Sequence, residues 1–482
     1  VGSEMCIRDS GGSGQKAIPN SLNITVTDTL KLEGTSACIL SSLGGSTLTY
    51  GPNASLVYNI SSGTTTLTAA SIEWPATNAP RFIEFRRNTV QFTANTVGNS
   101  RSISGTILFS GGTFTISQGD TLYMLNNSNI QRKSATGGLS YATASPGYYY
   151  VGALASDLIN LSIDAGVAVT EGKELIPNAG LGKINLSIGS GTNYTASGRT
   201  VNDFINNGIF TLTGSGTFTI NGDIAGTGTF TGVNTANLVI QGTNNGSTTS
   251  PLKFTSGSEN VQDLTINRTG VNASVLLGSN LTIARDLQLL AGILNDNGKT
   301  INVTRHISYS GAAQGTGTHI SGTGGKIVML ANYSTTTNYI GTTSLGNLEI
   351  NYSNTSKLLR AATSFTADNI NFAIPGIKFN LFGNVVTVRK DVTGYATDTI
   401  WNNGNNGSPL PNSRLVMIGS SNVINGLGVM DTLDIATAAN ITLNAPLSVK
   451  KLNLNGTIQD GGNTITNAGD VIGSGTQSGG GW

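Results

Sequence analysis

The stretch GIFTLTGSGTFTI, residues 208–220, contains the pattern that decides the fold. Apolar and hydroxyl side chains alternate in two short runs, with Phe210 and Leu212 in the first run and Phe218 and Ile220 in the second. A period of two is typical of a β-strand with one buried face, and the Gly-Ser-Gly between the runs indicates a tight turn. Since no segment of the chain has a sustained helical period, we expect short strands and few helices.

A longer repeat organises these short strands. The phrases DLTIN, NLEIN and TLDI contain Leu264, Leu348 and Leu433 at equivalent positions. Their nearly equal spacing of about 85 residues is an internal repeat, which indicates a solenoid or a propeller rather than a compact domain. We interpret the chain as five successive modules, of which the second is looser and the first and last are truncated: residues 11–126, 127–237, 238–326, 327–414 and 415–482.

The architecture that fits this pattern best is a parallel β-helix. One turn of such a solenoid takes about 20 to 25 residues in three short strands, so a module of about 85 residues corresponds to about four turns. We therefore predict an all-β, right-handed parallel β-helix, with Asn side chains stacked in ladders at its turns. A β-propeller is the structural alternative, but no half-module echo of its blades of about 40 to 50 residues is present.

Composition sets limits on function. The 482 residues include 64 Gly but only 11% charged residues, and the net charge is +1. This balance does not favour a nucleic-acid partner, and no apolar run approaches the roughly 20 residues that span a bilayer. Beyond Cys6 the chain has only Cys38, so no disulfide framework can form within it.

Catalytic and metal-binding groups are sparse in the sequence. His306 and His319 have no second ligand at metal-binding spacing, and we expect both side chains at the surface. We predict no enzyme activity, no catalytic residues, no metal and no cofactor.

Acidic residues recur at the outward position of the repeated strand, as Glu84, Glu349 and Asp434, with Thr265 in the intervening module. A spacing of about four turns would separate neighbouring acids by roughly 19 Å. Glycosidases need their two carboxyl groups within about 5 to 10 Å, so we do not expect these acids to form one site.

Aromatic residues are the remaining candidates for ligand contact, because sugar rings stack on exposed aromatic faces. The stretch SPGYYYVG contains Tyr148, Tyr149 and Tyr150, and strand alternation must expose at least one of them. Trp74 and Trp401 lie where loops begin. These five residues are the candidates for glycan stacking.

The order LVY, EWPATNAPRFIEF, SISGTILFSGGTFTISQGDTL and NLTIARDLQLLAGILNDNGKTINV resembles long, repetitive secreted proteins of Bacteroidota. The resemblance covers essentially residues 20–480 and implies a β-helical stalk or adhesin outside the cell or on its surface. Such proteins are commonly exported by the type IX system through a C-terminal sorting domain, which this chain does not display.

The first ten residues, VGSEMCIRDS, differ in composition from everything that follows. They resemble the translation of a transposon-end adapter used in sequencing libraries, and they contain no apolar core of a signal peptide. We therefore expect residues 1–10 to be foreign to the protein and to pack on nothing. We also expect the chain to be a metagenomic fragment of a longer protein.

Together these observations predict a structural and adhesive stalk segment of an extracellular or cell-surface repeat protein. Its expected partners are surface glycans or other extracellular polymers, bound by many weak contacts. A carbohydrate-active β-helix, such as a polysaccharide lyase or glycosidase, and a glycan-binding module without catalysis are the alternatives.

Overall fold

A computed structural model describes most of the chain, and all of its regular structure is β. The description covers residues 5–9, 14–34, 38–42, 44–68, 71–75, 78–92, 100–116, 120–141, 148–170, 182–308, 315–332, 337–352, 358–401, 410 and 413–480. The chain divides into two compact units, which are residues 1–212 with 220–229 (unit 1) and residues 213–219 with 230–482 (unit 2).

Unit 1 is built from parallel strands that pair turn upon turn. Its largest sheet contains β1 (Met5–Asp9), β4 (Thr29–Gly34), β7 (Ser55–Leu67), β8 (Phe82–Phe92), β10 (Thr106–Phe109), β11 (Thr113–Ile116), β13 (Asn129–Arg132), β14 (Gly138–Tyr141), β16 (Leu158–Ile163), β18 (Lys183–Ile188), β21 (Phe204–Asn206) and β24 (Ile224–Ala225). Its smaller sheets contain β2 (Gly14–Ile18), β3 (Asn23–Val26), β5 (Cys38–Ser42), β6 (Thr47–Tyr50), β9 (Ser100–Ile103), β12 (Thr121–Met124), β15 (Tyr148–Val151), β17 (Ala168–Thr170), β19 (Asn193–Ala196) and β22 (Ile209–Leu212). β20 (Thr200–Val201) also lies in unit 1, whereas β23 (Thr217–Ile220) and β25 (Thr229–Thr231) each contain residues of both units.

Unit 2 has two long parallel sheets and one short sheet. We call the longest one sheet A, which contains β26 (Asn237–Gly242), β28 (Asp263–Arg268), β31 (Asp286–Ala291), β34 (His306–Ile307), β37 (Thr337–Ile340), β39 (Leu358–Ala361), β40 (Phe365–Ala367), β42 (Lys378–Asn380), β43 (Val385–Val388), β45 (Thr399–Trp401), β46 (Arg414–Met417), β48 (Val429–Ile435), β50 (Leu447–Leu454), β52 (Ile465–Asn467) and β53 (Val471–Ile472). Sheet B contains β27 (Asn260–Val261), β30 (Leu281–Ile283), β33 (Thr300–Val303), β36 (Lys326–Met329), β38 (Asn347–Ile350), β41 (Asn369–Phe372), β44 (Val392–Thr393), β47 (Asn422–Asn425), β49 (Asn440–Leu443), β51 (Thr457–Gln459) and β54 (Thr476–Ser478). The short sheet contains β29 (Ser274–Leu276), β32 (Ile293–Asn295) and β35 (Thr318–Ile320).

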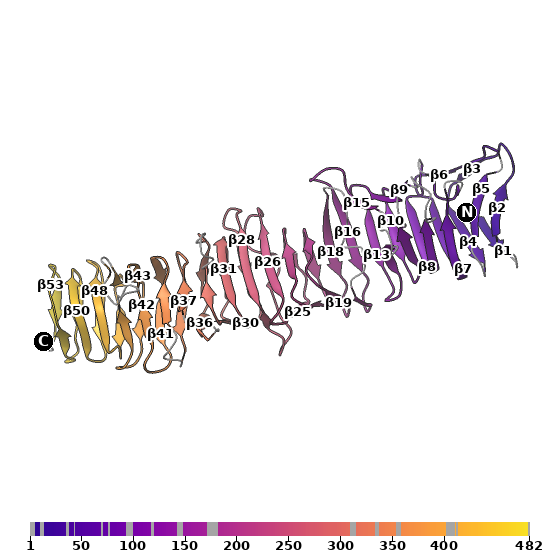
Figure 1. Ribbon diagram of the computed structural model, residues 1–482. Coiled ribbons are helices and arrows are strands. Elements are labelled where there is room, and N and C mark those ends of the chain that lie inside the picture. The colour runs from indigo at the N-terminus through magenta and orange to yellow at the C-terminus, as the bar shows by residue number, and fades with distance from the viewer. Residues whose placement is uncertain are drawn as a thin grey trace. The chain divides into compact units, whose positions relative to one another are not determined.

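The predicted fold class is confirmed, because the parallel strands stack as a β-solenoid (Figure 1). The two units together contain about 18 turns. The turns differ in length, as the pairs in register show. In unit 1, Leu186 pairs with Phe204 after a short turn, whereas in unit 2 a long turn separates Ile307 from its partner Ile340. A long turn leaves room for loops outside the stacked strands.

The interior of unit 1 contains a ladder of aromatic rings. Tyr58, Phe85 and Phe109 occupy the same register position on β7, β8 and β10, and each ring lies 5.4 Å from the next. Phe114 stacks on Phe85 at 5.3 Å, and Trp74 lies 5.4 Å from Phe114. All five side chains are buried. Alternation along the strands therefore points large aromatic side chains into the interior at successive turns.

The sequence modules of unit 2 do not correspond to whole turns. Leu264 lies in β28 of sheet A, whereas its repeat partner Leu348 lies in β38 of sheet B. The next partner, Leu433, lies in β48 and so in sheet A again. All three leucines are buried, which shows that the repeat preserves strand alternation and core-facing positions. A module therefore spans between three and four turns and moves the repeated strand from one sheet to another.

Asn and Asp side chains at the corners connect each turn to the next, as the predicted ladders require. In unit 2, Asn369 Nδ2 donates to Asn347 Oδ1 at 2.6 Å, and Asn369 Oδ1 accepts the backbone N–H of Asp391 at 3.0 Å. Asp391 Oδ1 in turn accepts the N–H of Val423 at 2.8 Å. At a corner the backbone turns away from the neighbouring strand, so its N–H groups lose their partners in the sheet. The side-chain oxygens of Asn and Asp accept hydrogen bonds from these N–H groups.

The expectation that residues 1–10 pack on nothing is wrong at the level of the backbone. Met5–Asp9 form β1, which pairs in parallel with β4 so that Met5 lies beside Leu30 and Ile7 beside Leu32. The end of a solenoid presents unpaired backbone groups, and an extended segment can pair with them whatever its origin. The adapter origin of this segment stays a prediction.

Candidate functional site

A groove on unit 2 is a concave surface with a consistent chemistry, and it has a volume of about 690 Å³. It lies where sheet B begins. Residues 233–236 close a tight turn through a hydrogen bond of 3.1 Å from Ala236 N to Val233 O, whereas one turn later the chain runs extended as β27. Beyond this tight turn, Asn260, Thr282 and Thr304 come from successive turns and line the groove.

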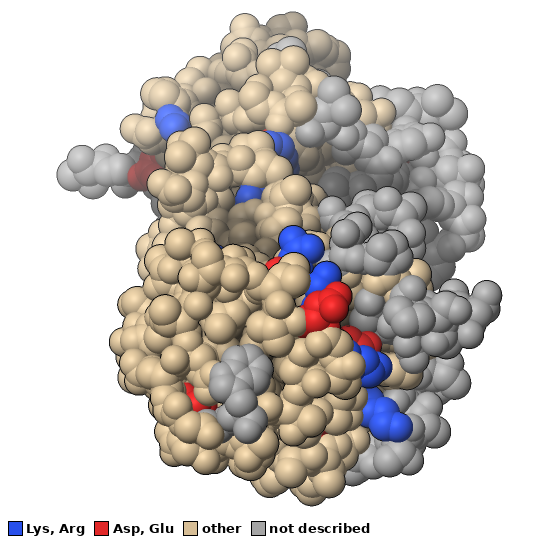
Figure 2. All heavy atoms as spheres, turned by 90° about the vertical axis from the view of Figure 1, so that its left-hand side faces the viewer, with Lys and Arg blue, Asp and Glu red and all other residues tan. Residues whose placement is uncertain are grey.

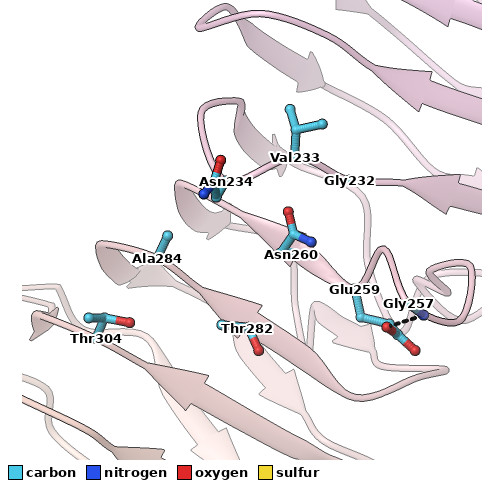
Figure 3. Close-up of a pocket in the computed structure, with 9 residues that line it drawn as sticks. All are labelled: Gly232, Val233, Asn234, Gly257, Glu259, Asn260, Thr282, Ala284 and Thr304. Carbon is cyan, nitrogen blue, oxygen red and sulfur yellow. Dashed lines mark hydrogen bonds between the residues drawn. The ribbon is translucent and has the colours of Figure 1, made fainter. Parts of the chain in front are cut away.

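The lining of the groove consists of small side chains, both polar and apolar. Figure 3 shows Asn234, Ala284 and Thr304 along one side, with Asn260 and Thr282 beside them on the strands. The remaining lining residues are Gly232, Val233, Gly257 and Glu259. The lining thus offers carboxamide, hydroxyl and carboxylate groups beside the small apolar side chains of Val233 and Ala284, and it contains no cationic side chain.

Two glycines help to shape the groove. A Cβ on Gly232 would lie 1.9 Å from the carbonyl oxygen of Asn260, so only glycine allows the two turns to approach there. Gly257 has a φ of +82° and its N–H donates to Glu259 Oε2 at 2.7 Å, which fixes the carboxylate at one end of the groove. Sequence reasoning missed this site, although the lengthened interval from Leu238 to Leu264 signals a wider turn.

The tyrosine candidates of unit 1 divide between core and surface. Tyr149 is buried, and burial removes it as a ring on which a sugar could stack. Tyr150 is half-buried and stacks on Tyr123 of the preceding turn, with ring centroids 5.0 Å apart. Tyr123, which sequence reasoning missed, is 39% exposed, and its neighbour on the other side in register is the small Ser102. The side chain of Tyr148 lies outside the described residues, although its backbone pairs with Thr121.

The tryptophan candidates also differ. Trp74 is completely buried in the aromatic interior of unit 1, so it presents no ring face to a ligand and that prediction is wrong. It lies in the irregular segment after β7, which turns inward instead of running over the surface. Trp401 is half-buried at the end of β45, and its role as a stacking residue stays a prediction.

Both histidines are buried, contrary to the prediction that they lie at the surface. His319 Nε2 lies 3.1 Å from Asp296 Oδ2, and both side chains are fully buried. The N–H of Gly346 donates to His319 Nδ1 at 3.1 Å, so Nε2 carries the proton that Asp296 accepts. Since both ring nitrogens are occupied, His319 serves packing and not base catalysis.

His306 is positioned by a different set of contacts. Asp286 Oδ1 accepts its backbone N–H at 3.2 Å, and its Nδ1 accepts the N–H of Tyr339 at 3.2 Å. Burial lowers the pKa of His306 to about 4; the charge of Asp286 raises this pKa, and the charge of Arg305 lowers it. The imidazole is therefore neutral at physiological pH and accepts a hydrogen bond from the next turn.

Charged residues on the outside form ion pairs that connect neighbouring turns. Figure 2 shows side chains of both signs gathered in a band on the visible surface, with a few more elsewhere on the same face. The pairs in unit 2 are Arg285–Asp263, Arg305–Asp286, Lys326–Glu349, Arg389–Asp368, Arg414–Asp434 and Lys450–Asp431.

The outward acids of the repeat also form ion pairs, which connect turns in unit 2 but lie within β8 for Glu84. Glu84 in unit 1 lies 2.9 Å from Arg86 Nε, whereas Glu349 and Asp434 lie in different sheets of unit 2. These acids do not converge, so they offer no pair of carboxyl groups for glycoside hydrolysis.

Unit 1 contains a buried acid that the sequence did not signal. Glu73 is fully buried, and its Oε2 accepts the N–H of Leu40 at 3.1 Å. Burial raises the pKa of Glu73 to about 7, although hydrogen bonds to the backbone and the charge of Arg101 act in the opposite direction. Arg101 is itself buried and donates to the backbone oxygens of Ser100 and Thr68. The cluster is enclosed, so its chemistry concerns folding and not a ligand.

Among the described residues, no group of three or more His, Cys, Asp or Glu side chains could hold a metal ion. The same part of the chain contains no helix that is long and apolar enough to cross a membrane. Comparison of the chain with protein-family models, with curated proteins and with solved structures gives no match. The functional argument therefore depends on the geometry of the two units.

Proposed function

We propose that the chain is a structural and adhesive segment of an extracellular or cell-surface repeat protein. The observation that carries the proposal is the set of side-chain links between neighbouring turns, made by the corner Asn and Asp ladders and by the ion pairs of unit 2. Links of this kind resist the separation of turns, which a segment under tension requires. The resemblance to secreted repeat proteins of Bacteroidota supports a place outside the cell and export by the type IX system.

Adhesion by this segment would depend on many weak contacts. Repeated turns present similar polar rows at regular intervals, so one extended polymer can touch several places at once. Linked contacts of low affinity raise overall retention by their effective concentration. The expected partners are surface glycans and other extracellular polymers.

Bead retention under flow tests this proposal. Beads carrying the whole chain at increasing density are passed over films of mucin and of neutral and acidic polysaccharides, and beads carrying heat-unfolded chain are the control. We expect retention to rise more steeply than bead density because of multivalency. Equal retention of folded and unfolded chain, or no retention at any density, would overturn the proposal.

Glycan binding without catalysis is the second candidate function, and the Tyr123–Tyr150 pair favours it. The exposed ring of Tyr123, stacked on the half-buried Tyr150 and beside Ser102, gives a sugar ring an apolar surface next to a hydroxyl group. We expect the double substitution Tyr123→Ala and Tyr150→Ala to weaken oligosaccharide binding by about tenfold, or ~1.4 kcal/mol. Isothermal titration checks this, with Tyr395→Ala in unit 2 as a matched control at an exposed tyrosine. Equal binding by both variants would exclude the pair.

A further inference from the structure

The groove of unit 2 contains polar side chains that make no hydrogen bonds within the described part of the chain. These are Asn234, Asn260 and Thr304, while Thr282 Oγ1 accepts only a long hydrogen bond of 3.4 Å from Asn302. Carboxamides are strong donors and acceptors, so their capacity in the groove is left for solvent or a ligand.

The same sheet shows how unusual this is. Further along the outer row of sheet B, Asn371 Nδ2 donates to Glu349 Oε2 at 3.3 Å, and Asn371 Oδ1 accepts Thr393 Oγ1 at 2.6 Å. Asn260 and Thr282 occupy the start of that row, since Asn260 pairs with Thr282 in register. Side chains of this row therefore form hydrogen bonds with one another later in the sheet. Where the groove lies, Asn260 does not take part in such bonds.

The spacing of the open groups suits a linear ligand. Asn260 and Thr282 are partners in register, and neighbouring parallel strands lie about 4.8 Å apart. Thr304 comes from the next turn, two residues beyond Asn302, which is the register partner of Thr282. Asn234 stands across from Asn260 on the tight turn that forms the wall (Figure 3). An extended ligand that crosses these turns would meet a polar side chain on each turn. It would meet the carboxamide of Asn234 on its opposite side.

The chemistry of the lining selects the ligand class. No Lys or Arg lines the groove, so nothing there neutralises a phosphate, sulfate or carboxylate. Amide, hydroxyl and carboxylate groups instead match vicinal hydroxyl groups, which both donate and accept. Glu259 is the only titratable side chain of the lining, and glycoside hydrolysis needs two carboxyl groups, so the groove is suited to binding without cleavage.

We propose that this groove is a binding subsite for a neutral, linear oligosaccharide, held by Asn234, Asn260, Thr282 and Thr304 with Glu259 at one end. The inference rests on the proposed function, because it names the ligand class of one surface contact of the adhesive segment. It differs from the tyrosine pair in unit and in chemistry, since hydrogen bonds and not ring stacking hold the sugar.

Titration of the whole chain with defined hexasaccharides tests the subsite. The probes are cellohexaose, xylohexaose and mannohexaose, with hexagalacturonate as the acidic comparison. We expect a neutral hexasaccharide to bind, the double substitution Asn234→Ala and Asn260→Ala to weaken binding at least tenfold, and Ala284→Trp to abolish it by filling the floor. Asn371→Ala, on the same row outside the groove, is the matched control and should change affinity less than twofold. Circular dichroism verifies that each variant is folded.

Several results would overturn the inference. These are the lack of binding by all neutral probes, equal or tighter binding of hexagalacturonate, and unchanged affinity in both groove variants. Loss of binding in the Tyr123 and Tyr150 variant alone would place the sugar on unit 1 instead.

Bead retention is measured in parallel. Retention without hexasaccharide binding contradicts only the groove, whereas hexasaccharide binding without retention contradicts only the adhesive function.

Discussion

Replacement of Asp296 by alanine is expected to lower the free energy of unfolding of the surrounding turns by about 3 to 5 kcal/mol. Asp296 is fully buried, and its Oδ2 accepts the proton of His319 Nε2. Its Oδ1 accepts the N–H groups of Gly298 at 3.0 Å and Gly322 at 2.8 Å. The Ser321 side chain also donates to this carboxylate. Alanine leaves these four donors without their acceptor and opens a cavity, and buried donors without partners are costly.

Hydrogen exchange measured by mass spectrometry gives the change in the free energy of local unfolding for peptides around residues 293–329. Urea unfolding gives the change in the free energy of unfolding for the whole chain. Asp296→Asn keeps the shape but brings an amide NH₂ towards a donor, so we expect an intermediate loss of about 1 to 3 kcal/mol. Asp470→Ala is the control, because Asp470 is exposed in the same unit and its loss should cost under about 0.5 kcal/mol. Equal effects at both positions would show that the Asp296–His319 pair does not stabilise the turns.

Sequence alone predicted the strand alternation and the corner ladders because both follow from local rules. Phe210 and Leu212 are buried as their period of two requires, and Asn297 adopts a φ of 51° in the turn that it forms with Gly298. The same rules could not show that Asp296, the residue before this turn, points inward. Its burial depends on His319, which lies one turn later and is its partner.

The groove could not be predicted from the sequence, for a different physical reason. The nearly constant length of the sequence repeat suggested uniform turns, but the pairs in register show that turn length changes along the chain. Leu186 pairs with Phe204, whereas the interval from Leu238 to its partner Leu264 is longer. Turn length depends on which residues leave the stacked strands as loops, and alternation in the strands does not report it. A surface that arises from a change in turn length is therefore invisible to a search for periodicity.

Buried titratable groups should give the two units opposite responses to pH. In unit 1, burial raises the pKa of Glu73 from 4.5 to about 7. Between these values the folded unit keeps a proton that the unfolded chain releases, so rising pH lowers the free energy of unfolding, by about 3 kcal/mol over the whole window. Below pH 4.5 the carboxyl is protonated in both states, and its contribution to stability is fully present.

In unit 2 the buried His306 acts in the reverse direction. Burial lowers its pKa from 6.5 to about 4, so between these values the unfolded chain binds a proton that the folded unit does not bind. Falling pH therefore lowers the free energy of unfolding of unit 2, again by about 3 kcal/mol over the window. Above pH 6.5 the imidazole is neutral in both states, and the stabilising contacts with Asp286 and Tyr339 are retained.

Hydrogen exchange at pH 5 and pH 7, corrected for intrinsic exchange rates, resolves the two responses in one sample. We expect peptides around Glu73 to be better protected at pH 5, and peptides around His306 to be better protected at pH 7. Glu73→Gln should flatten the response of unit 1 and leave that of unit 2 unchanged, because glutamine keeps the shape without titrating, and His306→Gln should do the converse. A shift of both units in the same direction, or a response of unit 1 that persists in Glu73→Gln, would mean that other groups control the pH dependence. If the two units respond in opposite directions, acidification lowers the free energy of unfolding of unit 2 and raises that of unit 1. Unit 2 is then the part of the segment that unfolds more readily in an acidic environment.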